Sequence, residues 1–169
     1  MSIERVNGGN NYQALASFQG DKFHKEAIDA LTMAGFEIAD QHYTVPDVGV
    51  ELDCITNNRH GLAMPWEFKG SWQGDRPGLR RTDTLKKAVG GAYMFAQSEM
   101  ALGMTPLLVM TTHFPQTGMG VLMLRCVKRN VVFAFVDSRD SKTLKWLYNA
   151  DEAKLRDYLN YQLDLLTRN

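Results

Sequence analysis

This chain of 169 residues has few cysteines and no net charge. Only two cysteines are present, Cys54 and Cys126, and neither belongs to a cluster of cysteine and histidine residues. This argues against a disulfide-stapled scaffold or a structural zinc site and is typical of a reducing compartment. Nineteen basic residues balance nineteen acidic ones, so the net charge indicates neither a nucleic acid nor a membrane as partner. A local patch of charged residues would have to bind any such partner.

Long apolar runs are also missing. No stretch approaches the ~18 uninterrupted apolar residues of a membrane span, and the opening MSIERVNGGN lacks the apolar core of a signal peptide. We therefore expect a cytoplasmic protein without a membrane partner. A composition of 44% hydrophobic and 22% charged residues is ordinary for a globular protein. We expect residues 1–169 to form one domain, with the polar residues 1–11 as a disordered tail.

The hydrophobic pattern predicts an α/β fold. Apolar residues at helical spacing predict a helix that starts at Ser17 or Asp21 and stops at Gly35. Alternation of apolar and polar residues then predicts a meander of three strands. The strands lie within 36–45, 48–56 and 62–70 and are followed by a Gly/Pro-rich loop (70–81), a helix capped by Thr82 or Asp83 (82–102), a buried strand (105–114), a hairpin (120–138) that turns at Arg129 and Asn130, and a last helix capped by Asn149.

Charged side chains interrupt two of these expected strands. Glu51 and Asp53 lie two residues apart in VELDCIT, and Glu67 and Lys69 lie two apart in EFK. Side chains two apart share a face of a strand, so pairing of the two strands would bring three carboxylates and one lysine together. Such carboxylates repel and raise one another's pKa unless a cation lies among them. The side chains expected on the opposite face are Val50, Leu52, Cys54, Trp66 and Phe68.

A divalent metal ion is the simplest such cation. Carboxylate oxygens without imidazole or thiolate suit a hard ion, so Mg²⁺ or Mn²⁺ is favoured over zinc. A lysine in the same cluster can orient metal-bound water, help to deprotonate it, or stabilise charge on a phosphoryl oxygen. The residues therefore indicate hydrolysis of a phosphodiester. Four histidines show no metal-ligand spacing and are expected at the surface or in loops: His24, His42, His60 and His113.

Asp53, a gap of thirteen residues and then Glu67-Phe68-Lys69 resemble the motif of the PD-(D/E)xK, or restriction-endonuclease-like, nuclease superfamily. The resemblance covers about residues 20–110, where the expected order of helix, three strands, helix and strand matches the common core of that family. It implies a restriction-endonuclease-like core with a mixed central sheet flanked by helices, here with an added C-terminal hairpin and helix. It also implies a Mg²⁺- or Mn²⁺-dependent deoxyribonuclease. Asp53, Glu67 and the Phe68 carbonyl would hold the metal, and Lys69 would serve the attacking water.

Three acidic residues near this motif have two interpretations each. Many members of the family offer an acidic residue on the first helix, and Glu26 is the candidate here, with a solvated surface glutamate as the alternative. Pro46-Asp47 spells a literal PD, so Asp47 competes with Asp53, but VPDVG indicates a turn, in which Asp is ordinary. We therefore prefer Asp53. Glu51 is either a further ligand or a charge at the strand edge.

A basic stretch follows the motif. From Lys69 to Lys87 there are six basic residues against two acidic ones, which predicts a patch that contacts phosphates. Trp72 would stack on a base or fold back onto its own loop. The expected substrate is DNA, with RNA as the alternative polymer. The candidate nucleic-acid contacts are Trp72, Arg76, Arg80, Arg81, Lys86 and Lys87.

The small size favours a nuclease of repair, recombination or phage DNA processing, structure-selective like the enzymes that resolve DNA junctions. Such enzymes commonly dimerise, and the apolar stretch 120–136 or the last helix is the candidate interface of a homodimer. The alternative hypothesis is a non-cleaving nucleic-acid-binding or assembly protein that keeps a nuclease-like core. The presence of Asp53, Glu67 and Lys69 together argues against that alternative.

Overall fold

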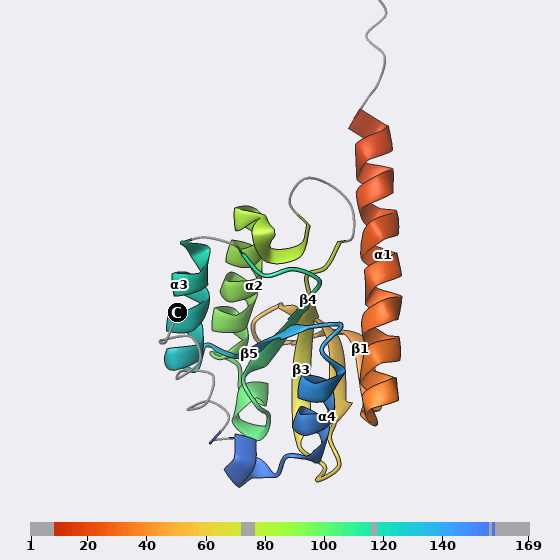
Figure 1. Cartoon of the computed structure of the whole chain (residues 1–169). Coiled ribbons are helices and arrows are strands. Elements are labelled where there is room, and N and C mark those ends of the chain that lie inside the picture. The colour runs from red at the N-terminus through yellow and green to blue at the C-terminus, as the bar shows by residue number, and fades with distance from the viewer. Residues whose placement is uncertain (1–8, 72–76, 116–117, 156, 158–169) are drawn as a thin grey trace, which may run out of the picture.

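A five-stranded mixed sheet forms the centre of the molecule in the computed structural model (Figure 1). The structure describes residues 9–71, 77–115, 118–155 and 157. The strands lie side by side in chain order, β1-β2-β3-β4-β5; the first three are antiparallel and the last three run parallel. The elements are α1 (Gly9–Ala34), β1 (Glu37–Thr44), β2 (Glu51–Asn57), β3 (Ala63–Phe68), the 3₁₀ helix η1 (Gly78–Arg80), α2 (Thr82–Phe95), η2 (Met100–Gly103), β4 (Leu107–Thr111), α3 (Met119–Lys128), β5 (Val132–Asp137) and α4 (Ser141–Asn149).

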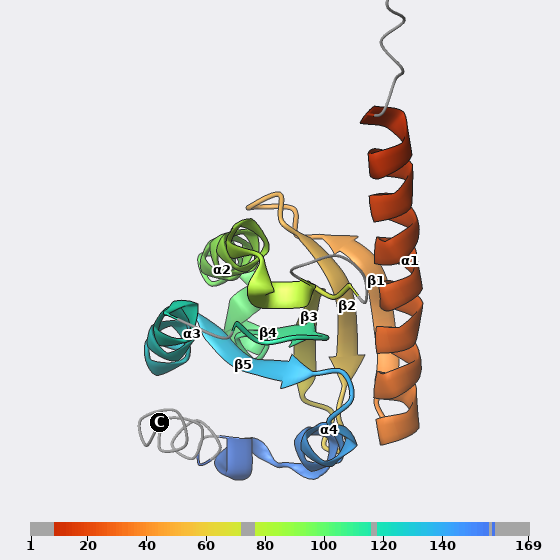
Figure 2. The same cartoon turned by 45° about the horizontal axis from the view of Figure 1, so that its top comes forward.

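Helices cover both faces of the sheet, and this α/β arrangement agrees with the general class expected from the sequence (Figure 2). One core lies beneath α1 and α4, where Phe23 and Leu31 meet Trp66. The other lies beneath α2 and α3, where Leu85 meets Val109. All five residues of β4 are buried, because this strand is covered on both faces. Among the described residues, no helix combines the length and the apolar character needed to cross a membrane.

Helix α1 is longer than expected. It begins at Gly9, so residues 9–11, expected in a disordered tail, are helical, while residues 1–8 lie outside the described part of the chain. The predicted stop is confirmed, because Gly35 follows the last helical residue with φ of 109° and donates its N–H to the Thr32 carbonyl at 3.0 Å. The amino-terminal half of α1 stands clear of the sheet (Figure 1).

The expected hairpin at 120–138 is wrong. Residues 120–128 belong to α3, and β5 pairs with β4 in parallel. A parallel neighbour needs a crossover connection, and α3 provides it. A short apolar run fits either a strand or one face of a helix, so the apolar pattern of residues 120–128 did not distinguish the two. Met123 and Val127 face the chain's own core, so the apolar surface expected for a homodimer interface is largely used inside the molecule.

The helices that follow β3 also differ from expectation. Helix α2 ends at Phe95, and its N-cap is Arg81 rather than Thr82 or Asp83. Helix α4 was not expected; Asp140 caps it by accepting the Thr143 N–H at 3.0 Å. Asn149 ends α4, and the helical residues 152–155 are capped instead by Asp151, which accepts the Lys154 N–H at 2.9 Å.

Candidate metal centre

Asp53 lies where β2 separates from β3. The pairing of the two strands ends with Cys54 opposite Trp66, and Asp53 is the adjacent residue of β2. Its Oδ2 accepts a hydrogen bond from the Phe68 backbone N–H at 2.6 Å. The carboxylate therefore replaces a carbonyl of the strand ladder. This bond ties Asp53 to the Glu67-Phe68-Lys69 segment and brings the two halves of the sequence motif together.

Glu67 and Lys69 form an ion pair at the end of β3, with side chains that are only 14% and 24% exposed. Burial raises the pKa of Glu67, and the carboxylates of Asp53 and Glu51 raise it further, whereas the Lys69 ammonium opposes the shift. The parallel ladder continues through Lys69, whose N–H donates to the Met110 carbonyl at 2.8 Å. Three carboxylates and one ammonium thus share one electrostatic environment.

The apolar residues around this cluster differ from expectation in one respect. Cys54, Trp66 and Phe68 belong to the core beneath α1, as a shared face requires. Val50 and Leu52 belong instead to the core beneath α2. Leu52 and Cys54 are two residues apart, so the alternation of β2 breaks at Asp53. The break coincides with the position where Asp53 leaves the ladder and bonds through its side chain.

Two histidines converge on Asp53 from other elements. His24 on α1, His42 on β1 and Asp53 place their ligand atoms within 4.8 Å of one another. The two imidazole rings stack with centroids 4.4 Å apart and planes 12° apart. His24 Nε2 lies 3.3 Å from Gln41 Oε1, and His42 Nδ1 lies 3.3 Å from Glu51 Oε1. His24 is partly buried and His42 is exposed, so both lie at the surface as expected, but they lie close to each other and to Asp53.

The position of His42 explains why the sequence concealed this group. In the β1–β2 pairing Gln41 is opposite Cys54 and Tyr43 is opposite Leu52, so His42 lies level with Asp53. His42 has φ of 54°, in the left-handed region that few residues other than glycine adopt. Such conformations cost free energy and cluster at functional sites. Register and backbone conformation, rather than spacing along the chain, bring the imidazole here.

A cavity of about 340 Å³ opens over this group. Its donors are imidazole and carboxylate, a set that suits Mn²⁺ or a similar transition metal better than Mg²⁺. Glu67 and Lys69 do not line this cavity, so it brings Asp53 and Glu51 together with the two histidines but not with the rest of the predicted cluster. Burial raises the pKa of the Cys54 thiol to about 12, so no thiolate competes. The lining residues are Gly20, Asp21, His24, His42, Glu51, Asp53 and Phe68.

Glu26 and Asp47 are placed elsewhere. Glu26 pairs with Lys22 at 3.9 Å and does not line the cavity. It follows His24 by two residues, about 200° around the helix, so α1 cannot present both to the same site. The Asp47 carboxylate accepts the Glu99 backbone N–H at 2.8 Å in a turn. Of the two candidate aspartates, Asp53 is the one that lies beside Glu67.

The basic residues divide into two groups. Arg81 is exposed and pairs with Asp83 at 3.4 Å, and Lys86 and Lys87 are exposed on α2. Arg80 is partly buried at the end of η1. Two further candidates, Trp72 and Arg76, lie outside the described residues.

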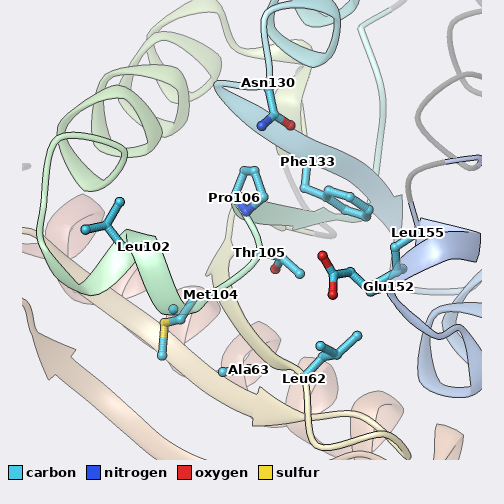
Figure 3. A pocket seen from close by; sticks show the side chains of 11 residues that line it. Leu62, Ala63, Leu102, Met104, Thr105, Pro106, Asn130, Phe133, Glu152 and Leu155 are labelled. Carbon is cyan, nitrogen blue, oxygen red and sulfur yellow. The ribbon is translucent and has the colours of Figure 1, made fainter.

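A second cavity, of about 410 Å³, lies near the amino ends of β4 and β5 (Figure 3). It is mostly apolar, and Glu152 is its one charged side chain among the described lining residues. The Asp53 cavity and Lys69 lie apart from it, and none of the candidate site residues lines it. The candidate catalytic and metal-binding side chains therefore lie around Asp53, Glu67 and Lys69 and not at this second cavity.

Comparison with protein-family models, curated proteins and solved structures finds no match to this chain.

Proposed function

We propose that the chain is a metal-dependent deoxyribonuclease of the PD-(D/E)xK type. The observation that carries the proposal is the buried Glu67, paired with Lys69 and within the field of Asp53 and Glu51. Lys69 offers one positive charge to three carboxylates, so the cluster loses stability unless a further cation joins it. The order of helix, three antiparallel strands, helix and parallel strand supports the same proposal.

The side chains have distinct roles in this proposal. Asp53, Glu67 and the Phe68 carbonyl would hold Mg²⁺ or Mn²⁺, which when bound stabilises a phosphoryl oxygen and lowers the pKa of water. His24 and His42 would extend the donor set around Asp53. Lys69 would orient the attacking water and stabilise the charge that develops on the phosphate.

The backbone of the substrate would lie along Arg80 and α2, where exposed cations are available for phosphates. Structure-selective cleavage in repair, recombination or phage DNA processing is the role we favour. The decisive measurement incubates the purified chain with supercoiled, linear, single-stranded and four-way-junction DNA, and with RNA, in Mg²⁺, Mn²⁺ or EDTA. We expect cleavage of DNA with either metal and none in EDTA. Binding without cleavage under every condition would favour the non-cleaving alternative.

A pair of isosteric variants separates this site from a contaminating nuclease. Asp53→Asn should abolish cleavage while the fold is retained, because the variant removes a charged ligand and changes no volume. Asp47→Asn is the matched control and should cleave at the wild-type rate, since its carboxylate caps the Glu99 N–H. The reverse result would move the ligand role to Asp47. Cleavage retained by Asp53→Asn, Glu67→Gln and the double variant would end the proposal.

A further inference from the structure

Arg80 is a cation without a counter-ion in the described part of the chain. It is partly buried at the end of η1, and no ion pair to it is formed there. Its Nε is buried and has no hydrogen-bond partner among the same residues. Buried donors are almost always satisfied, and a partly buried charge is costly unless it is paired. Arg80 therefore has unused capacity for an anion.

The position of Arg80 is fixed against the end of β4. Gly78 has φ of 60°, and a Cβ atom there would lie 2.7 Å from Thr111 Oγ1 and 2.9 Å from the backbone nitrogen of His113. Leu79 donates its N–H to the His113 carbonyl at 3.0 Å. η1 thus packs directly on the residues that follow β4, and this contact holds Arg80 near His113.

A second guanidinium reaches the same place from β5. Arg139 donates from Nη2 to the Thr112 carbonyl at 2.8 Å and binds both oxygens of Asp137, through Nη2 at 2.6 Å and Nε at 2.9 Å. Burial lowers the pKa of His113, and the charges of Arg80 and Arg139 lower it further, so both guanidinium groups act on the ring. Asp137 opposes them but is already bonded to Arg139. Among the described residues, one positive charge of this cluster therefore stays without a counter-charge.

This cluster adjoins the candidate metal centre. Thr111 Oγ1 donates to the Lys69 carbonyl at 2.7 Å, and Thr112 Oγ1 donates to the Ser71 carbonyl at 2.8 Å. The residues that follow β3, β4 and β5 therefore form one edge, the carboxyl end of the parallel strands. Ligands of open α/β sheets bind at this edge.

We propose that Arg80, His113 and Arg139 form a phosphate-binding subsite beside Lys69 that holds a phosphate group of the nucleic acid. The identity of the polymer rests on the proposed function, whereas binding of phosphate itself does not depend on cleavage. A guanidinium matches phosphate oxygens in a planar, bidentate geometry. The phosphate is either an internal diester or the terminal monoester at a strand end.

The first test uses inorganic phosphate in EDTA, so that no cleavage occurs. The ring resonances of His113 are followed by NMR as phosphate is added to the wild type, Arg80→Gln and Lys128→Gln. Lys128 is the control, an exposed cation at the end of α3, away from the carboxyl ends of the strands. We expect a saturable shift with similar affinity for phosphate in the wild type and Lys128→Gln. The affinity should be at least ~10-fold lower in Arg80→Gln, since a charge-assisted bidentate contact is lost. Equal titrations in all three proteins would overturn the subsite.

The second test uses oligonucleotides with and without a 5′-phosphate. The slope of log affinity against log salt should fall by about 0.9 in Arg80→Gln and stay unchanged in Lys128→Gln, as loss of one phosphate contact requires. Tighter binding of the phosphorylated strand, lost in Arg80→Gln, identifies a terminal phosphate, and equal binding identifies an internal one. Cleavage with an unchanged Arg80→Gln slope would refute the subsite alone. Phosphate binding without any cleavage would refute the nuclease and leave the subsite.

Discussion

Replacement of Glu67 by glutamine separates metal binding from folding. The substitution keeps the volume of a side chain that is 14% exposed but removes its charge. Because the folded-state pKa of Glu67 is raised, the folded chain binds this proton more tightly than the unfolded chain. The stabilising contribution of the group is present below its unfolded pKa and is lost as the pH rises through the folded pKa. Without metal, Glu67→Gln should therefore be more stable than wild type at neutral pH, and the difference should vanish near ~pH 4.

Metal reverses this order. A ligand at 100 times its Kd stabilises the folded state by ~2.7 kcal/mol, and each kcal/mol shifts Tm by ~2–4 °C for a chain of this length. Wild type should then gain about 5–11 °C on addition of Mg²⁺ or Mn²⁺. Glu67→Gln should gain less than half of that, since the amide has no charge to offer the ion. The substitution also removes the ion pair with Lys69, which opposes the gain in stability, because the ammonium, only 24% exposed, loses its counter-charge.

The assay is thermal unfolding of both proteins in EDTA, Mg²⁺ and Mn²⁺, between pH 4 and pH 8. Glu37→Gln is the matched control, because Glu37 is exposed at the start of β1 and should leave both the metal shift and the pH profile unchanged. Equal metal-induced shifts in wild type and Glu67→Gln would refute the placement of the ion at Glu67. A variant that is less stable than wild type without metal at neutral pH would refute the argument from converging carboxylates.

Three other predictions test neighbouring parts of the molecule. Lys69→Ala should keep metal and DNA binding but lower single-turnover cleavage by at least ~10²-fold. Lys69→Arg should lower cleavage almost as much, because a guanidinium is effectively never deprotonated and differs in shape from an ammonium. Near-normal cleavage by Lys69→Ala would show that the lysine has no role in catalysis. His42→Gln should weaken Mn²⁺ binding, measured by calorimetry, ~10-fold more than Mg²⁺ binding, since only the softer ion gains from imidazole; equal losses would contradict an imidazole ligand. Gly78→Ala should destabilise the fold in urea by at least ~1 kcal/mol more than Gly61→Ala, because both glycines have positive φ but only at Gly78 would a Cβ clash; equal costs would mean that η1 is not packed tightly on β4.

The wrong assignment of α3 shows where sequence patterns stop being informative. MGVLMLRCVK is apolar at nearly every position, so it has no clear period over its 10 residues. The decision between strand and helix came from the sheet, because β5 adds in parallel beside β4 and needs a crossover. By contrast, the positions of β2 and β3 could be predicted because their apolar residues and the turn between them are local properties, although the alternation of β2 breaks at Asp53.

The sequence by itself determined which residues carry the carboxylate and lysine charges and that Glu67 and Lys69 share a face, since the two-residue period of a strand needs no knowledge of the rest of the fold. It also determined the turn chemistry around Asp47 that argued for Asp53. Only the tertiary structure decided that His24 and His42 meet at Asp53, because they lie on a helix and a strand that touch through packing and strand register. The same reason applies to Arg80, His113 and Arg139, which three separate segments bring to one edge of the sheet. Contacts between segments far apart in the chain depend on how helices pack on the sheet, and no local spacing records that.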